Sequence, residues 1–298
     1  MISRPNPNII PDLLYTLGNV QQDQQTTTEE IATGRSVNNL SDNPAVAAMI
    51  VNNNALSSQN DQFLANVSDL QSKFQVGDSA LSSAIQLMTT AISVGTEGAN
   101  GTLSVSERQA LGAQITGIQQ QMLSLANTSY QGTYLFSGTV VTTQPFAEDA
   151  SSPSGVSYGG NSGVTSVEIS TGQSMKTNVP GDQVFTNSSG NVFQALNDLA
   201  NALNSGNGIE AANTEVQQAF NELNTQRVFY GNALSQVQSQ ESFLNQDQVN
   251  LSQQQTDLAG VNMAQAISNS SQEQIAQEAL LNVTGQVLNL PTLLNYLK

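Results

Sequence analysis

Apolar residues recur along most of this chain at alternating steps of three and four, the spacing of a helix face that packs against another helix. The clearest run covers residues 63–88, where every step is filled. Runs with the same spacing cover residues 10–31, 111–125, 192–203, 216–251 and 276–297, the first of them with a polar middle. Sustained heptads of this kind predict long helices that lie side by side with a left-handed supercoil.

Glycines and capping residues mark where these helices end and begin. Gly34 breaks the first run, and the turn at residues 41–44 leads into the next helix. Residues 95–101 hold three glycines that close the second helix, and Ser104 with Glu107 forms a capping-box pattern that predicts a helix start. Gly77 lies on the apolar face of the second helix, where it would let another element approach closely.

The segment from about residue 139 to residue 190 has a different character. Gly, Ser, Thr and Val dominate it, and short alternations such as residues 167–169 favour strands. Helical periodicity returns at residue 192. We interpret this segment as a small β domain inserted between helical halves.

These patterns predict a mainly α fold with an inserted small β domain. The long heptad-patterned helices form a coiled-coil or bundle rod, and the N- and C-terminal helices pair. Three domains are expected: residues 1–40 with 260–298 as a terminal assembly domain, 41–138 with 191–259 as an inner helical rod, and 139–190 as an outer β domain. The terminal helices have narrow, partly polar seams, so we expect them to be mobile in the monomer and to order on assembly.

The apolar seams of the two terminal helices are the candidate assembly interface. The alternative interpretation is that they form the core of one closed helical bundle. The candidate interface residues are Ile10, Leu13, Leu17, Val20, Leu280, Val283, Val287, Leu290, Leu294 and Leu297.

The charge balance excludes several partners. Only 10% of the residues are charged, against about 25% in an average protein. The net charge is -16, and the seven Lys and Arg residues are spread singly along the chain. Such a chain repels phosphate backbones and anionic lipid surfaces, so we predict no binding to nucleic acid or membrane.

The residue types also argue against an enzyme. The sequence has no Cys and no His, which removes the usual thiolate nucleophile, general base and zinc ligands. Asp42 beside Asn43 could suggest calcium, but turn and cap chemistry explains the pair. Glu148-Asp149 could suggest a hydrolase dyad, but a solvated loop explains it. We therefore predict no catalytic residue, no metal site and no cofactor.

No segment of the sequence resembles a membrane span or a cleavable signal peptide. Residues 1–12 hold three prolines and no apolar core, and the longest apolar run, residues 44–51, is too short to cross a bilayer. If the chain leaves the cell, we expect export without a cleavable signal peptide.

Several motifs resemble flagellins and, more closely, the hook-associated protein 3 family of hook–filament junction proteins. The segment 31–45 (IATGRSVNNLSDNPA) resembles the stretch after the first helix of flagellins. Residues 132–139 (GTYLFSGT) resemble the junction-protein form of the next landmark, and residues 158–185 resemble its β domain. Residues 261–267 (VNMAQAI) and 293–297 (LLNYL) also fit. One departure is Pro291, which lies inside the last heptad run and is expected to kink it or start a separate turn.

This resemblance implies a structural subunit of the extracellular bacterial flagellum. Copies would form a ring between hook-associated protein 1 and the first flagellins, with a flagellar export chaperone on the C-terminal segment and export through the type III pathway. The alternatives are a flagellin-like filament subunit and, in a different class, a secreted coiled-coil adhesin. A filament subunit would polymerise alone, and an adhesin would carry more aromatic residues than the 5% present here.

Overall fold

The computed structural model describes residues 9–39 and 41–288. These residues form seven helices and eight short strands. They divide into two compact units, which are described separately: a terminal unit, residues 1–59 with 248–298, and a middle unit, residues 60–247. The helices α2 (Pro44–Gly98) and α6 (Ile209–Ala259) contribute to both units.

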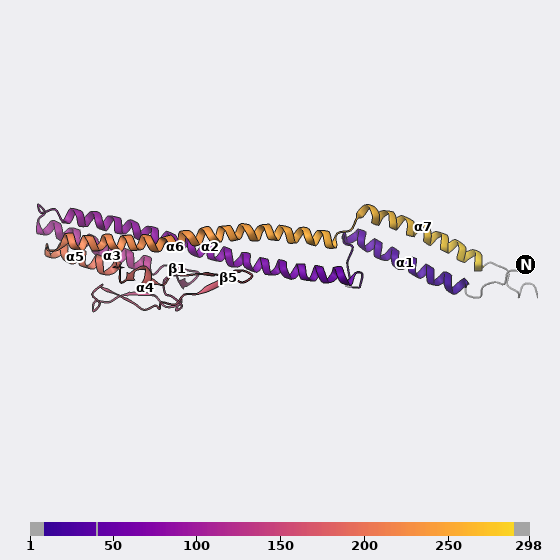
Figure 1. Cartoon of the computed structure of the whole chain (residues 1–298), viewed down its shortest axis with the longest axis horizontal. Helices are drawn as coiled ribbons and strands as arrows, with labels where there is room; N and C mark the ends of the chain where they lie inside the picture. Colours follow the sequence, from indigo (N-terminus) through magenta and orange to yellow (C-terminus); the bar gives the residue numbers. More distant parts are fainter. Residues whose placement is uncertain (1–8, 40, 289–298) are drawn as a thin grey trace, which may run out of the picture. The chain divides into compact units, whose positions relative to one another are not determined.

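The terminal unit contains the paired helices α1 (Ile9–Thr33) and α7 (Met263–Leu288), which run side by side in Figure 1. Proline at position 11 falls in the first turn of α1, where no intrahelical N–H bond is lost. The helix stops at Gly34, whose φ of +68° suits glycine. At the start of α7, the Asn262 side chain accepts a hydrogen bond from the Gln265 N–H at 3.2 Å. The predicted pairing of the terminal helices is confirmed.

In the middle unit, α2 and α6 pack with α3 (Val105–Ala126) and α5 (Val192–Ser205) around one core. The predicted capping box is present: Ser104 Oγ accepts from the Glu107 N–H, and a Glu107 carboxylate oxygen accepts from the Ser104 N–H. The whole predicted seam of residues 63–88 is buried, namely Phe63, Val67, Leu70, Phe74, Gly77, Leu81, Ala84 and Met88.

Two polar residues of α6 form hydrogen bonds with α2, and such pairs favour one register between packed helices. The Arg227 guanidinium binds the Asp78 carboxylate at 2.8 and 3.1 Å within the middle unit. In the terminal unit, Gln248 donates to the Ser57 hydroxyl at 3.1 Å.

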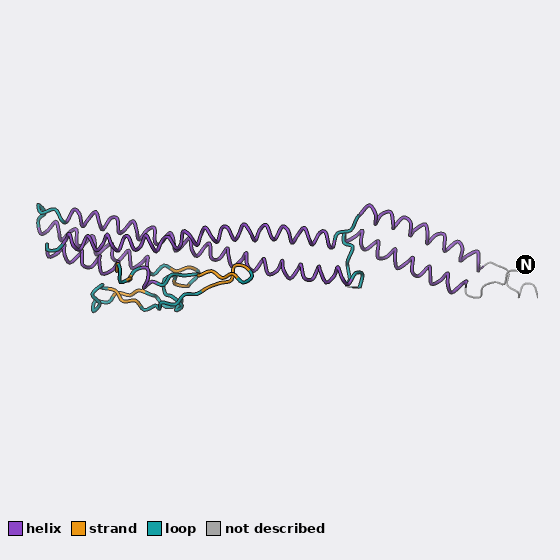
Figure 2. Tube along the Cα trace, viewed as in Figure 1, coloured by secondary structure: helices purple, strands orange, loops and turns teal. Residues whose placement is uncertain are grey.

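The strands of the described residues form four separate two-stranded antiparallel sheets (Figure 2). They are β1 (Ser129–Tyr130) with β2 (Thr133–Tyr134), β3 (Phe146–Glu148) with β4 (Val156–Tyr158), β5 (Ser166–Ser170) with β6 (Gln173–Lys176), and β7 (Thr186–Asn187) with β8 (Gly190–Asn191). One short helix, α4 (Gly181–Val184), lies between β6 and β7. The prediction of a mainly α chain with a small inserted β segment is confirmed.

The β segment does not have a core of its own. Phe146 on β3 is fully buried. The centroid of its ring lies 5.4 Å from that of Phe193 on α5 and 5.6 Å from that of Phe185. The other buried apolar side chains of the β segment belong to the same cluster as those of the helices. The first two strands also precede residue 139, where the β segment was expected to begin. The three-domain division therefore stays a prediction, and the β segment is packed as part of the helical core.

Candidate functional site: the terminal helix pair

The described residues of the predicted assembly interface lie mainly between α1 and α7. Their packing is partial: Leu13, Leu17, Val20, Leu280 and Val287 are half-buried. Two others, Ile10 and Val283, are each 44% exposed. Leu290, Leu294 and Leu297 lie outside the described residues. The seam therefore serves first to pair the two helices of one copy, and its role between copies stays a prediction.

The middle of this helix pair is polar. Thr27 of α1, only 6% exposed, donates from its hydroxyl to Oε1 of Glu273 on α7 at 2.9 Å. The second carboxylate oxygen of Glu273 is buried and has no hydrogen-bond partner among the described residues. A buried polar pair at one level of a two-helix seam disfavours shifted pairings, because a shift would leave both groups without a partner.

A second set of large apolar side chains points away from this seam. On α1, Tyr15 is 73% exposed and Leu14 is 56% exposed. On α7, Ile275, Ile267 and Leu281 are each more than half exposed. Exposed aliphatic side chains on a pair of helices make this surface a candidate for contact with another protein. These residues were not predicted from the sequence, because the strongest heptad on each helix marks only the seam; their position next to or between seam residues was the available signal.

The terminal unit is poor in positive charge. Its described residues include the acids Asp12, Asp23, Glu29, Glu30, Asp42, Asp257, Glu273 and Glu278, but Arg35 is their one cation. Carboxylates that face one another across such a surface would repel, so its apolar and amide groups are the ones suited to contact with a second copy.

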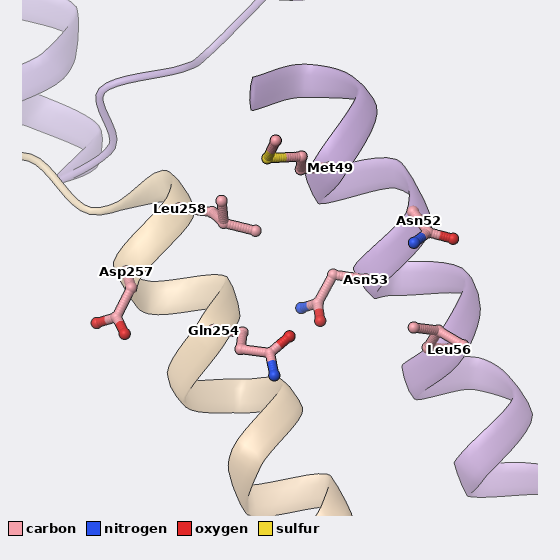
Figure 3. Close-up of a pocket in the computed structure, with 7 residues that line it drawn as sticks. All are labelled: Met49, Asn52, Asn53, Leu56, Gln254, Asp257 and Leu258. Carbon is pink, nitrogen blue, oxygen red and sulfur yellow. The ribbon is translucent and has the colours of Figure 1, made fainter. Parts of the chain in front are cut away.

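A groove follows the line where the start of α2 meets the end of α6 within the terminal unit (Figure 3). Its volume is about 380 Å³, and it is lined by Met49, Asn52, Asn53, Leu56, Gln254, Asp257 and Leu258. Asn53 lies at its floor and points toward α6, where its amide donates to Leu251 O at 2.9 Å and to Gln255 Oε1 at 3.0 Å. These bonds fasten α2 to α6 at the base of the terminal unit.

In the part of the chain that the structure describes, no group of three or more Asp and Glu side chains is arranged to hold a metal ion. Across residues 9–39 and 41–288, no helix is both long and apolar enough to span a membrane.

Two family models match the chain at its two ends. Residues 11–141 match the bacterial flagellin N-terminal helical region, and residues 214–297 match the bacterial flagellin C-terminal helical region. The chain belongs to the flagellin family. The matched regions include α1 and α7, so the two ends that pair in this structure are the two ends that define the family.

Within this family, the chain is similar to flagellar hook-associated protein 3 from two bacteria. The chain is 27% identical to flagellar hook-associated protein 3 of Escherichia coli K12, over 84% of this chain and 86% of that protein. It is 26% identical to flagellar hook-associated protein 3 of Salmonella typhimurium LT2, over 88% of this chain and 89% of that protein. The resemblance to hook-associated protein 3 found in the sequence motifs is confirmed. The flagellin-family chain is a structural component of the bacterial flagellum, and these relatives are structural proteins.

Solved structures with a similar fold include a flagellar junction protein. The flagellar junction protein FlgL from Legionella pneumophila matches with a TM-score of 0.61 and 15% identity, over 72% of this chain and all of that chain. At this level of identity, the likeness concerns the fold alone. It confirms a flagellin-like architecture for the helices and the inserted β segment.

Proposed function

We propose that this flagellin-family protein joins the flagellar hook to the filament by assembling as a ring through its terminal unit. One observation carries the proposal: α1 and α7 pair within one copy, yet their seam is only partly buried and further large apolar side chains stay exposed. We call these exposed side chains the outward row: Leu14, Tyr15, Ile267, Ile275 and Leu281. Such a surface suits a subunit whose terminal helices pack against equivalent helices of neighbouring copies.

We infer the neighbours from the resemblance to hook-associated protein 3 and from the junction role proposed here. A junction subunit contacts further copies of itself, hook-associated protein 1 on the hook side and flagellin on the filament side. A flagellar export chaperone holds the C-terminal segment before export through the type III pathway. The role of the junction subunit itself is mechanical, with no catalytic step, and it acts in the extracellular flagellum.

The test replaces apolar side chains of the outward row and leaves the seam between α1 and α7 unchanged. We change Leu14, Tyr15, Ile275 and Leu281 together to Ser. Each large apolar side chain removed from water stabilises a contact by about 1.5–3 kcal/mol, so four losses per subunit abolish incorporation. The purified variant keeps its helical content, and cells that carry it build hooks but release flagellin monomers into the medium.

A matched control changes exposed apolar residues of the middle unit, Val105 and Val164, to Ser. These cells remain motile with normal filaments. If the outward-row variant also gives normal filaments, the assembly surface is wrong. If the purified parent protein polymerises alone into long filaments, the protein is a filament subunit and not a junction subunit.

A further inference from the structure

Two asparagines of this chain are followed directly by glycine: Asn100 precedes Gly101, and Asn207 precedes Gly208. Both pairs lie in exposed turns of the middle unit, the first between α2 and α3 and the second between α5 and α6. The two turns lie at the same end of this unit, where the end of α2 packs against α5 and the start of α6 (Figure 1). The proposed junction role uses neither pair.

An asparagine that precedes glycine can lose its side-chain amide without an enzyme, because glycine has no β-carbon to obstruct its own backbone nitrogen. That nitrogen gives up its proton and bonds to the side-chain carbon Cγ of the asparagine. The bond from Cγ to Nδ2 then breaks, ammonia leaves, and a succinimide ring remains. Water opens the ring to give aspartate or isoaspartate. The net reaction converts an amide and water into a carboxylate and ammonium.

The reacting groups at Asn207 are weakly held. The Asn207 Nδ2 donates to Ser205 O at 3.4 Å, which is longer than the usual range, and its side chain forms no other hydrogen bond with the described residues. The Gly208 N–H, which supplies the attacking nitrogen, donates to no acceptor in the part of the chain that the structure describes. The side chain and the backbone nitrogen are therefore free to approach each other.

The side chain of Asn100 is held more firmly. Its Oδ1 accepts a hydrogen bond from the Thr102 hydroxyl at 2.9 Å and another from the Thr102 N–H at 3.2 Å. An asparagine that accepts from the backbone two residues later forms an Asx turn, which fixes its side chain. The Asn100 side chain must leave this turn before its Cγ can reach the Gly101 nitrogen, so its reaction is slowed by the fold.

The surroundings of Asn207 accommodate the negative charge that the reaction creates. The Arg108 guanidinium lies against the backbone of Gly206, where a β-carbon would overlap it. Arg108 forms no ion pair with the described residues, and its buried Nε has no hydrogen-bond partner among them. The helix α6 begins at Ile209, and a carboxylate just before a helix N-terminus is stabilised by the helix dipole. A carboxylate at position 207 therefore leaves the fold intact.

We propose that Asn207–Gly208 is a site of spontaneous deamidation, and that the fold makes it the faster of the two Asn-Gly pairs. The residue that follows is glycine in both, so the difference arises from the hydrogen bonds that hold Asn100 and leave Asn207 free. Each conversion adds one negative charge to a chain whose net charge is -16. Older molecules accumulate the change. This inference goes beyond the proposed junction role and does not depend on it.

The experiment follows both asparagines in the full-length protein during incubation at mildly alkaline pH. Trypsin cuts after Lys and Arg, which places Asn207 on the peptide 177–227 and Asn100 on the peptide 74–108. Tandem mass spectrometry then gives the converted fraction of each asparagine over time. The same incubation in guanidinium chloride supplies the unfolded reference, in which no turn protects either side chain.

In the folded parent, Asn207 converts about fivefold or more faster than Asn100, whereas the two rates differ by less than about twofold in the unfolded chain. Thr102→Val deletes the hydroxyl that holds Asn100, so it accelerates conversion of Asn100 in the folded protein and leaves Asn207 unchanged. Asn207→Gln abolishes conversion at position 207 and does not alter Asn100. Asn207→Asp, which imitates one product, unfolds at the same denaturant concentration as the parent.

Four outcomes overturn the proposal. Equal rates for Asn207 and Asn100 in the folded protein would show that the fold does not distinguish them. The same ratio of rates in the folded and the unfolded protein would show that the difference is not structural. An unchanged rate for Asn100 in folded Thr102→Val would contradict the protective role of the turn. A clear loss of stability in Asn207→Asp would show that position 207 does not accommodate the product.

Discussion

Tyr230 on α6 lies with its ring directly against the backbone of Gly77 on α2, so that a β-carbon at position 77 would overlap the ring. The tyrosine is 2% exposed, and burial raises the pKa of its hydroxyl. Its ring also meets that of Phe74 edge-on, with centroids 6.0 Å apart. The glycine is thus the space in which a large aromatic side chain of the partner helix packs.

Gly77→Ala is expected to destabilise the middle unit. Overpacking a core costs about 1–3 kcal/mol, which exceeds the gain of up to about 1 kcal/mol that alanine brings to a helix. Chemical unfolding followed by circular dichroism measures the change. Gly117→Ala on α3 is the control: it has open space around its β-carbon and should be neutral or slightly stabilising. A stabilised Gly77→Ala protein would contradict the close packing.

Phe146→Ala should destabilise the helices as well as the β segment. Replacing a fully buried phenylalanine by alanine costs about 3–5 kcal/mol, and Phe146 contacts rings from α5 and from the segment before β7. Helical ellipticity and near-ultraviolet signals of the aromatic residues should be lost in one transition at lower denaturant. Val140→Ala, at a position 40% exposed, is the control. If the helical transition is unchanged in Phe146→Ala, the β segment is an independent domain after all.

The Arg227–Asp78 ion pair should contribute little to stability and should be sensitive to salt. Its side chains are 39% and 27% exposed, and a pair of this kind is worth about 0.2–1 kcal/mol. A double-mutant cycle with Arg227→Gln and Asp78→Asn gives the coupling free energy, which should fall as salt is added. A coupling above about 2 kcal/mol that salt does not alter would assign the pair a buried, structural role.

The turn before α2 should make stability depend on pH through Asp42. Its carboxylate accepts from the Asn39 and Asn38 N–H groups at 2.7 and 3.0 Å, and the bond from Asn39 is the main reason that the pKa of Asp42 is lowered from 3.8. A lowered folded pKa gives stability that is present above 3.8 and lost as pH falls through the folded value.

Asp42→Asn tests this dependence. The variant should be less stable than the parent near neutral pH, and the difference should shrink as pH falls below 3.8. Thermal unfolding at several pH values measures both proteins. Because Asp42 is fully exposed, the difference is expected to be small. A difference that grows toward acid pH would contradict the sign of the effect.

Much of the fold was predictable because helix packing leaves a periodic signature. The buried faces of α1, α2, α3, α5 and α6 follow the apolar steps in the sequence, and Gly34 and the Ser104–Glu107 box end or start helices where local chemistry requires it. Of the candidate site, the pairing of α1 with α7 was predicted, the role of the seam residues between copies stays a prediction, and the outward row was not found. When one face of a helix is strongly apolar, its periodicity dominates the sequence pattern, and a second, weaker apolar face gives no clear periodicity of its own.

The helical class, the helix ends and the apolar face of each helix can be predicted from the sequence, because they depend on residues a few positions apart. Which faces meet depends on the three-dimensional packing of the chain. Tyr230 packs on Gly77, Phe146 lies in the helical core, and the Ser36 N–H donates a hydrogen bond to Ala259 O. These contacts join residues far apart in the chain. Apolar periodicity identifies the buried face of a helix but not the element that packs against it. The energies of these contacts depend on shape and on hydrogen bonds that exist only once the long-range pairing has formed.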